Sequence, residues 1–270
     1  MKLKALLLFG AVYLSCWSSL LQAQTFQRLY AFHIEPPVTV AADTYGRIYV
    51  ATREGEISSY TPTGELLYTY SPQSAAYYTA LDAKAGLQIG SFDENSQQLL
   101  FLDRFLNLLS TERLPPDLFG YATALSWSAG NTLWVADAGS LQLKKWAPGR
   151  RELLTTVNLS QFGQESTFNI EALKEYQHKL YLFTQNRLYV FDCLGTFEKM
   201  LPLPEWIHYT FADDQLLLLT ADSLLRFPLY GGKPDSFALP EGGPYTHLLY
   251  SEEIYFFFNE EIATAYRQLP

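Results

Sequence analysis

Residues 38–70 read VTVAAD-TYG-RIYVAT-REG-EISSYTP-TG-ELLYTY, and they contain the clearest structural pattern in the chain. Four short apolar runs are separated by three turns that each contain a glycine, the pattern of short strands joined by tight turns. Neighbouring strands joined in this way pair antiparallel. The stretch therefore predicts a four-stranded meander, which is one blade of a β-propeller.

The same unit recurs five more times along the chain. Its second strand is expected to start near Arg47, Leu87, Thr132, Lys179, Gln215 and Glu253. The third strands are expected at EISSY, QLLFLD, LQLKKW, RLYVFD, SLLRF and IATAY. The intervals between second strands, 36 to 47 residues, are of the size of a propeller blade. The pattern predicts an all-β, six-bladed propeller that forms a single domain over residues 24–270.

One turn resembles a known family. The segment YTPTGEL, residues 60–66, is similar to the turn between the third and fourth strands of NHL-type and related six-bladed propellers. The resemblance covers about a dozen residues in each blade. It implies the fold and no activity.

The two ends of the chain predict how the ring closes. Residues 25–34 look like a spare strand before the first complete unit, whereas the last unit stops at Pro270 after three strands. We expect residues 25–34 to pair with residues 262–268, because this pairing covers two sheet edges that would otherwise be exposed. A β-sandwich with a helical insert around residues 165–177 is the structural alternative.

The first 23 residues are expected to be a signal peptide. Two lysines precede an apolar run at residues 6–14, and cleavage is expected after Ala23. The apolar run is too short to span a bilayer, so no transmembrane span is expected after cleavage. The alternative is a lipoprotein signal with acylation at Cys16. Both readings place the protein in the bacterial envelope, either in the periplasm or at the outer membrane.

Composition and motifs exclude several function classes. The net charge is −9 and no basic stripe is visible, so we expect no nucleic-acid partner. After cleavage Cys193 is the one remaining cysteine, which rules out an internal disulfide in that form. The sequence has no nucleophile elbow, phosphate-binding glycine loop, HExxH, CxxC or EF-hand pattern. We assign no catalytic residue, no metal ligand and no cofactor.

The face most suited to binding carries the loops that enter the inner strands and the loops between second and third strands. These loops are rich in aromatic and acidic residues, and rigid aromatic rings supply contact area at low entropic cost. The pattern favours docking of a protein partner in the envelope, or of a glycan. Solvated turns and rings packed between blades would give the same residues, so that interpretation stays open. The candidate residues are Tyr78, Tyr121, Trp206, His208, Tyr245, His247, Glu94, Asp137 and Glu260.

The alternative function is a calcium-dependent hydrolase or lactonase, as in some six-bladed relatives. Calcium needs several oxygen ligands, but the acids of the predicted inner strands share no common position. They are Asp43, Asp82, Glu171 and Asp213. His208 and His247 fall early in adjacent inner strands and are expected to approach each other. The sequence favours a non-catalytic scaffold that binds a protein or another ligand.

Overall fold

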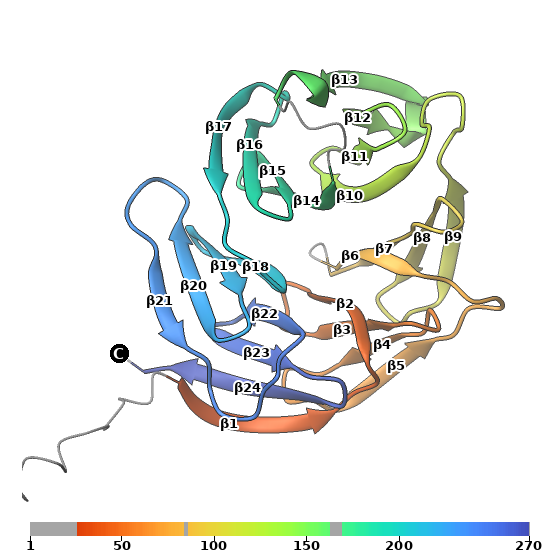
Figure 1. The fold of residues 1–270 in the computed structure, drawn as a ribbon. Coiled ribbons are helices and arrows are strands. Elements are labelled where there is room, and N and C mark those ends of the chain that lie inside the picture. The colour runs from red at the N-terminus through yellow and green to blue at the C-terminus, as the bar shows by residue number, and fades with distance from the viewer. Residues whose placement is uncertain (1–25, 84–85, 163–168, 270) are drawn as a thin grey trace, which may run out of the picture.

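The computed structural model describes residues 26–83, 86–162 and 169–269, and it confirms the six-bladed β-propeller (Figure 1). Six four-stranded antiparallel sheets surround a central axis. The sandwich alternative is wrong. Residues 170–176 form an inner strand, because an apolar face there packs between two blades. The predicted signal peptide lies outside the described residues. Within the described ranges, no helix is long and apolar enough to cross a bilayer.

The blades follow one another along the chain, and each strand has an equivalent in every blade. The inner strands are β2 (Pro37–Ala42), β6 (Tyr78–Asp82), β10 (Ala122–Ser128), β14 (Ile170–Tyr176), β18 (His208–Ala212) and β22 (His247–Ser251). The second strands are β3 (Ile48–Thr52), β7 (Gln88–Asp93), β11 (Thr132–Asp137), β15 (Lys179–Thr184), β19 (Gln215–Leu219) and β23 (Ile254–Phe258). Each begins within one residue of its predicted start.

The two outer layers complete the sheets. The third strands are β4 (Ile57–Tyr60), β8 (Gln98–Asp103), β12 (Gln142–Ala147), β16 (Arg187–Asp192), β20 (Ser223–Pro228) and β24 (Ile262–Gln268). The outermost strands are β5 (Leu66–Tyr70), β9 (Leu108–Arg113), β13 (Glu152–Asn158), β17 (Phe197–Pro202), β21 (Asp235–Ala238) and β1 (Phe26–His33). Two 3-10 turns, η1 (Pro148–Arg150) and η2 (Leu159–Gln161), flank β13.

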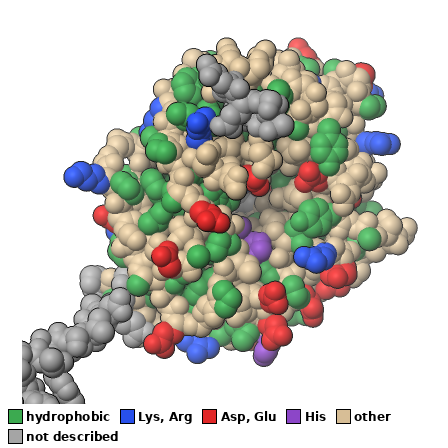
Figure 2. Space-filling model, viewed as in Figure 1, with side chains coloured by type: hydrophobic (Ala, Val, Ile, Leu, Met, Phe, Trp, Pro, Cys, Tyr) green, Lys and Arg blue, Asp and Glu red, His purple; other side chains and the backbone are tan. Residues whose placement is uncertain are grey.

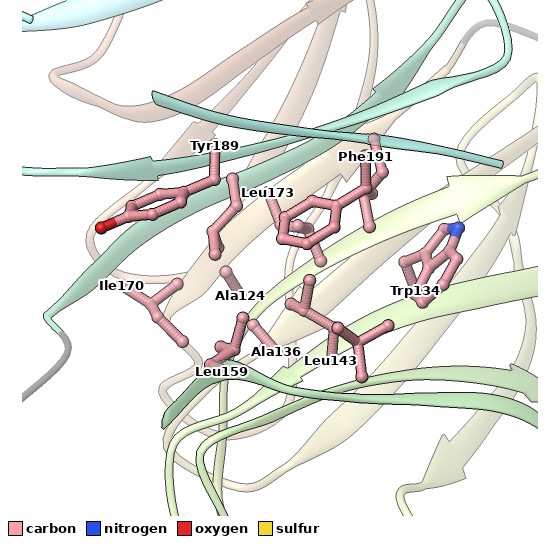
Figure 3. Packing of buried hydrophobic residues seen from close by; sticks show 12 residues of the cluster. Ala124, Trp134, Ala136, Leu143, Leu159, Ile170, Leu173, Tyr189 and Phe191 are labelled. Carbon is pink, nitrogen blue, oxygen red and sulfur yellow. The ribbon is translucent and has the colours of Figure 1, made fainter. Parts of the chain in front are cut away.

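The core lies between the blades. Every residue of β3 and β11 is buried, whereas every residue of β9 is exposed. A second strand is covered on both faces by neighbouring blades, so its sequence is a continuous apolar run without alternation. The described residues form six buried clusters, one at each contact between blades. Figure 3 shows the cluster between blades 3 and 4, where Trp134 and Phe191 pack from opposite sheets.

The chain ends close the ring in the predicted way. Strand β1 pairs antiparallel with β24, from Phe26 opposite Gln268 to His33 opposite Ile262. The sixth blade therefore has the order β1-β24-β23-β22 and contains both ends of the described chain. Phe26 is 1% exposed, so the first described residue is also part of the core. The closing strand contributes both ladder hydrogen bonds and packing.

The turn between third and fourth strands has a common geometry in three blades. Thr61, Asp103 and Asp192 each accept a hydrogen bond from the backbone N–H four residues later, at 2.7–2.9 Å. The residue before that donor has a positive φ in each case, for example +91° at Gly64. Only glycine adopts this conformation without cost, which explains the glycine in the YTPTGEL segment. Cys193 lies in the third of these turns as a free, half-buried thiol.

Candidate functional site

A central cavity of about 860 Å³ runs between the six inner strands. Figure 2 shows one face of the molecule with a hollow at its centre and a histidine side chain in it. The inner strands begin at one mouth of this cavity, the mouth that the predicted face surrounds. Residues from all six inner strands line it. A cavity of this size accommodates a small ligand.

Two histidines line the cavity at equivalent positions of blades 5 and 6. His208 pairs with Leu219 and His247 pairs with Phe258, each the last residue of a second strand. In the other four blades, small residues pair with the last but one residue of the second strand, and these are Thr39, Ala80, Ala124 and Ala172. The two imidazole centroids lie 4.7 Å apart. The expected approach of the two histidines is therefore observed.

Burial keeps both rings neutral. Burial lowers the pKa of His208 well below its usual value, and the neighbouring His247 lowers it further. Burial also lowers the pKa of His247. Nδ1 of His208 accepts the N–H of Leu248 at 3.3 Å, so the proton of the neutral ring is on Nε2. Nε2 of His247 lies 3.0 Å from the carbonyl oxygen of Val38 and donates to it.

This arrangement makes the protein less stable in mild acid. A histidine whose pKa is lower in the native state binds its proton at higher pH in the unfolded state than in the native state. The free energy of unfolding therefore decreases as the pH falls below the unfolded pKa of about 6.5. We expect the melting temperature to fall between pH 8 and pH 5.5, and to fall less steeply in His208→Gln, whose side-chain oxygen can still accept the Leu248 N–H. The exposed His178→Gln is the control. If the melting temperatures of wild type and His208→Gln depend on pH in the same way, His208 does not cause the loss of stability in mild acid.

An ion pair spans the cavity below the histidines. Nζ of Lys174 on β14 lies 3.1 Å from Oδ2 of Asp82 on β6. These strands belong to blades 4 and 2, which are not neighbours, so the pair reaches past blade 3. Both side chains lie near the ends of their inner strands, away from the mouth with the histidines. The ion pair therefore narrows the cavity at the end away from the histidines, and the carboxylate of Asp82 balances the charge of Lys174.

Four inner strands carry a β-bulge near the mouth. The residues that the register skips are Val38, Thr79, Thr123 and Glu171. A bulge leaves the extra residue outside the ladder and changes the direction of its side chain. Thr79, Thr123 and Glu171 line the cavity. Within the described part of the chain, the buried hydroxyls of Thr79 and Thr123 have no hydrogen-bond partner.

The structure brings several of the predicted residues together at the mouth. Glu94, Trp206, His208 and His247 all line the cavity. Tyr121 is exposed, and its hydroxyl donates to Oε1 of Glu94 at 3.3 Å. Burial raises the pKa of Glu94, although this hydrogen bond opposes the shift.

The side chain of Trp206 is partly occupied by contacts within the protein. Its Nε1–H donates to the carbonyl oxygen of Thr184 at 3.2 Å, and its ring lies 5.6 Å from that of Phe183. It therefore both packs between blades 4 and 5 and lines the cavity.

Four other predicted residues do not reach the cavity. Tyr78 and Tyr245 are 4% and 5% exposed and belong to clusters between blades. Asp137 is fully buried, where it binds Lys144 and the backbone N–H groups of Gly120 and Tyr121. Glu260 is exposed in the loop between β23 and β24, away from the cavity lining. Phe168, another aromatic residue of the loops entering the inner strands, lies outside the described residues.

The acids considered for calcium do not converge. Both oxygens of Asp43 are used inside its own blade, by backbone N–H groups and the hydroxyl of Tyr49. Asp82 is paired with Lys174, and Asp213 accepts from the hydroxyl of Tyr250. Among the residues that the structure describes, no group of three or more His, Cys, Asp or Glu is placed to hold a metal ion.

Thr79, Thr123 and Lys174 also line the cavity, and none of them was among the predicted residues. A repeated tripeptide carries the signal for the first two, since residues 79–81 and 123–125 both read TAL in adjacent inner strands. No local pattern marks Lys174, because its partner is 92 residues away in the sequence.

Comparisons with known proteins identify the fold. Neither a protein-family model nor a curated protein matches the sequence. Solved propellers do match the structure. The Pan2 WD40 domain of Neurospora crassa has a TM-score of 0.62 at 10% identity, covering 93% of this chain and 98% of that one. The Cps50 (Swd1) β-propeller domain of Myceliophteria thermophila gives 0.65 at 11% identity, covering 89% and 99%.

An enzyme is also among the similar structures. Catalytically inactive virginiamycin B lyase from Staphylococcus aureus, solved with quinupristin, has a TM-score of 0.64 at 10% identity and covers 91% of this chain and 100% of that one. The same architecture thus occurs in WD40 domains and in a lyase. At such low identity the likeness extends to the fold alone.

Proposed function

We propose that the chain is an exported, NHL-like six-bladed propeller without catalytic activity, which binds a protein partner or another ligand in the bacterial cell envelope. The observation that carries this proposal is the mouth of the central cavity, where Glu94 and His208 line the cavity and the exposed Tyr121 hydrogen-bonds to Glu94. Strand β18 carries His208, and a hydrogen bond joins the loop residues Tyr121 and Glu94, so part of the site is preorganised for binding.

The chemistry of the mouth supports binding more than catalysis. Nδ1 of His208 and both nitrogens of His247 already have protein partners. The carboxylate of Glu94 faces the hydroxyl of Tyr121. These groups offer polar contacts around a hollow, together with the indole ring of Trp206. Export is inferred from residues 1–23, with lipoprotein processing at Cys16 as the alternative.

Capture from the native envelope tests the proposal. The full chain with a C-terminal tag is expected to be recovered from the envelope fraction with a bound partner and an N-terminus at Gln24. Tyr121→Ala is expected to reduce recovery of the partner at least about fivefold, because removal of an exposed aromatic contact weakens an interface. Its melting temperature should change little, since the side chain is 43% exposed.

The matched control is Tyr45→Ala. Tyr45 is 65% exposed in the turn between β2 and β3, on the opposite face of the ring. It should leave recovery unchanged. Equal recovery of the partner with both variants would contradict binding at this face. Recovery of the tagged chain only in the cytoplasmic fraction would contradict export.

A further inference from the structure

We propose that the protein partner presents a carboxylate, and that Arg53 binds this carboxylate in a side pocket next to the mouth of the central cavity. The inference rests on the proposed binding function and adds the chemistry of the group that the partner contributes. It comes from a second hollow on the same face, from the unpaired arginine that lines it, and from the fixed backbone around it.

The side pocket lies between loops of blades 1 and 2. Its volume is about 370 Å³, and its lining consists of Arg53 in the loop after β3, residues 75–77 before β6, and Asn95 in the loop after β7. Tyr77 lines the central cavity as well, so the two hollows share a wall. All three loops belong to the proposed binding face. A partner that docks at the mouth therefore also covers the side pocket.

Arg53 supplies an unpaired positive charge. Of the described residues that line the two hollows, Arg53 and Lys174 are the only lysines or arginines, and Lys174 is paired with Asp82. The side chain of Arg53 is exposed and has no hydrogen-bond or ion-pair partner in the described part of the chain. A guanidinium presents paired N–H groups whose geometry matches the two oxygens of a carboxylate. All of these N–H groups are available at Arg53.

The neighbouring polar groups suit the same ligand. Asn95 is exposed and Tyr77 is 37% exposed, and neither side chain has a hydrogen-bond partner among the residues that the structure describes. The amide of asparagine and the hydroxyl of tyrosine can both donate a hydrogen bond. Two neutral donors beside a guanidinium favour a ligand group that only accepts, and an ionised carboxylate is such a group.

Charge favours a carboxylate over a phosphate. Glu54 follows Arg53 in the chain, Glu94 precedes Asn95, and the net charge of the whole chain is −9. A phosphate group carries up to about two negative charges near pH 7. Because the Coulomb energy is proportional to charge, the surrounding acids repel a phosphate more strongly than a singly charged carboxylate.

The backbone around the pocket is fixed by two contacts. A Cβ atom on Gly55 would lie 2.9 Å from the carbonyl oxygen of Ala76, so the loop after β3 touches the segment before β6 through the backbone. Oδ1 of Asp93 accepts the backbone N–H groups of Tyr77 at 3.2 Å and Asn95 at 3.0 Å. The unpaired side chains are therefore carried by a preorganised frame, which lowers the entropic cost of binding.

The direct test compares N-acetylglycine, which has a peptide-like carboxylate, with the neutral N-acetylglycinamide. Binding to the full mature chain is followed by the NMR signals of the backbone N–H groups of residues 53 and 95. We expect saturable shifts with N-acetylglycine, with a Kd on the order of 10 mM for so small a ligand. The amide is expected to bind at least about tenfold more weakly, because the charge-assisted hydrogen bonds are lost.

Three outcomes of this comparison would overturn the inference. They are equal binding of the two compounds, the absence of a saturable shift with N-acetylglycine, and tighter binding of inorganic phosphate than of N-acetylglycine.

Two substitutions of Arg53 locate the site. Arg53→Gln is expected to weaken binding of N-acetylglycine at least about tenfold, because the charged donor is removed. Arg53→Lys keeps the charge and loses the paired N–H groups, so it should recover only part of the affinity. Neither should lower the melting temperature, because no contact within the described protein is lost. Wild-type affinity in either variant would contradict recognition by the guanidinium.

The matched control is Arg151→Gln. Arg151 is exposed between η1 and β13, on the opposite face of the ring, and its side chain also has no partner among the described residues. This variant should bind N-acetylglycine as the wild type does. A loss equal to that of Arg53→Gln would show a general effect of net charge and would contradict a site at Arg53.

Envelope capture separates this inference from the proposed function. Arg53→Gln is expected to reduce recovery of the partner at least about fivefold, because a charge-assisted contact is lost. If capture depends on Tyr121 and is unchanged by Arg53→Gln, the carboxylate inference is wrong and the binding function stands. If neither Tyr121→Ala nor Arg53→Gln changes capture, both proposals fail.

Discussion

Replacing Phe26 by alanine is expected to lower the free energy of unfolding by about 3–5 kcal/mol, the cost of removing a buried phenylalanine from a packed core. The Phe26 ring centroid lies 5.3 Å from that of Tyr255, 5.6 Å from Phe257 and 6.4 Å from Tyr266, all in edge-to-face contact. Its loss opens a void at the start of the strand that closes the ring. Urea unfolding followed by tryptophan fluorescence measures the effect.

The same strand supplies the control for Phe26→Ala. Gln27 is the next residue of β1 and its side chain is exposed. Gln27→Ala should change the free energy of unfolding by no more than about 0.5 kcal/mol, as for most surface substitutions. If the two variants unfold alike, packing of the first described residue does not hold the ring closed.

The substitution Asp137→Asn is expected to lower the free energy of unfolding by about 3–5 kcal/mol, the cost of removing one partner of a buried ion pair. Oδ2 of Asp137 lies 2.6 Å from Nζ of Lys144, and the carboxylate also accepts backbone N–H groups from Gly120, Tyr121 and Ser140. In Asp137→Asn, Lys144 keeps its charge in a buried site without its counter-ion. Chemical denaturation at pH 7 gives the difference.

The pH dependence supplies an independent check on Asp137. Burial alone would raise the pKa of this carboxyl, but hydrogen bonds from Lys144 and the backbone outweigh burial and lower it well below its usual value. The stability that this shift provides is therefore present above the unfolded value of about 3.9 and is lost as pH falls further. Asp137→Asn should lose less stability than wild type in that acidic range. The histidine effect appears at higher pH, so the two are separable.

Two controls accompany this substitution. Asp137→Asn combined with Lys144→Met should recover part of the lost stability, because the unpaired charge is removed. Glu152→Gln tests an exposed pair, since Glu152 lies 3.6 Å from Arg150 and both side chains are more than half exposed. It should cost less than about 1 kcal/mol. A cost for Asp137→Asn as small as that for Glu152→Gln would contradict a structural role of the buried pair.

Much of the architecture could be predicted because it depends on local patterns. Glycine turns and apolar runs place the second strands, from RIYVAT at blade 1 to EIYFFF at blade 6, within one residue of the observed starts. Ring closure followed from the spare strand at residues 25–34 and the strand missing at the other end. The physical basis is the cost of leaving a sheet edge unpaired.

The candidate site was harder to predict because burial of a loop residue depends on the neighbouring blade. Glu94 and Asp137 both lie at the junction of a second strand and the following loop, and both look like acids on the binding face. Glu94 lines the cavity, whereas Asp137 is covered because Lys144 and the loop at Gly120 close over it. Tyr121 and Tyr245 differ in the same way, one exposed and the other inside a cluster.

The number of blades, the strand order and the closing strand can be predicted from the sequence, because they follow from turn residues, apolar runs and unpaired edges within short segments. The side chains that line the cavity, in contrast, depend on the folded structure. A bulge in four inner strands and its absence in two sets which side chains reach the mouth, and the Lys174–Asp82 pair joins residues 92 positions apart. Such contacts depend on packing six distant strands around one axis, and no local pattern encodes that arrangement.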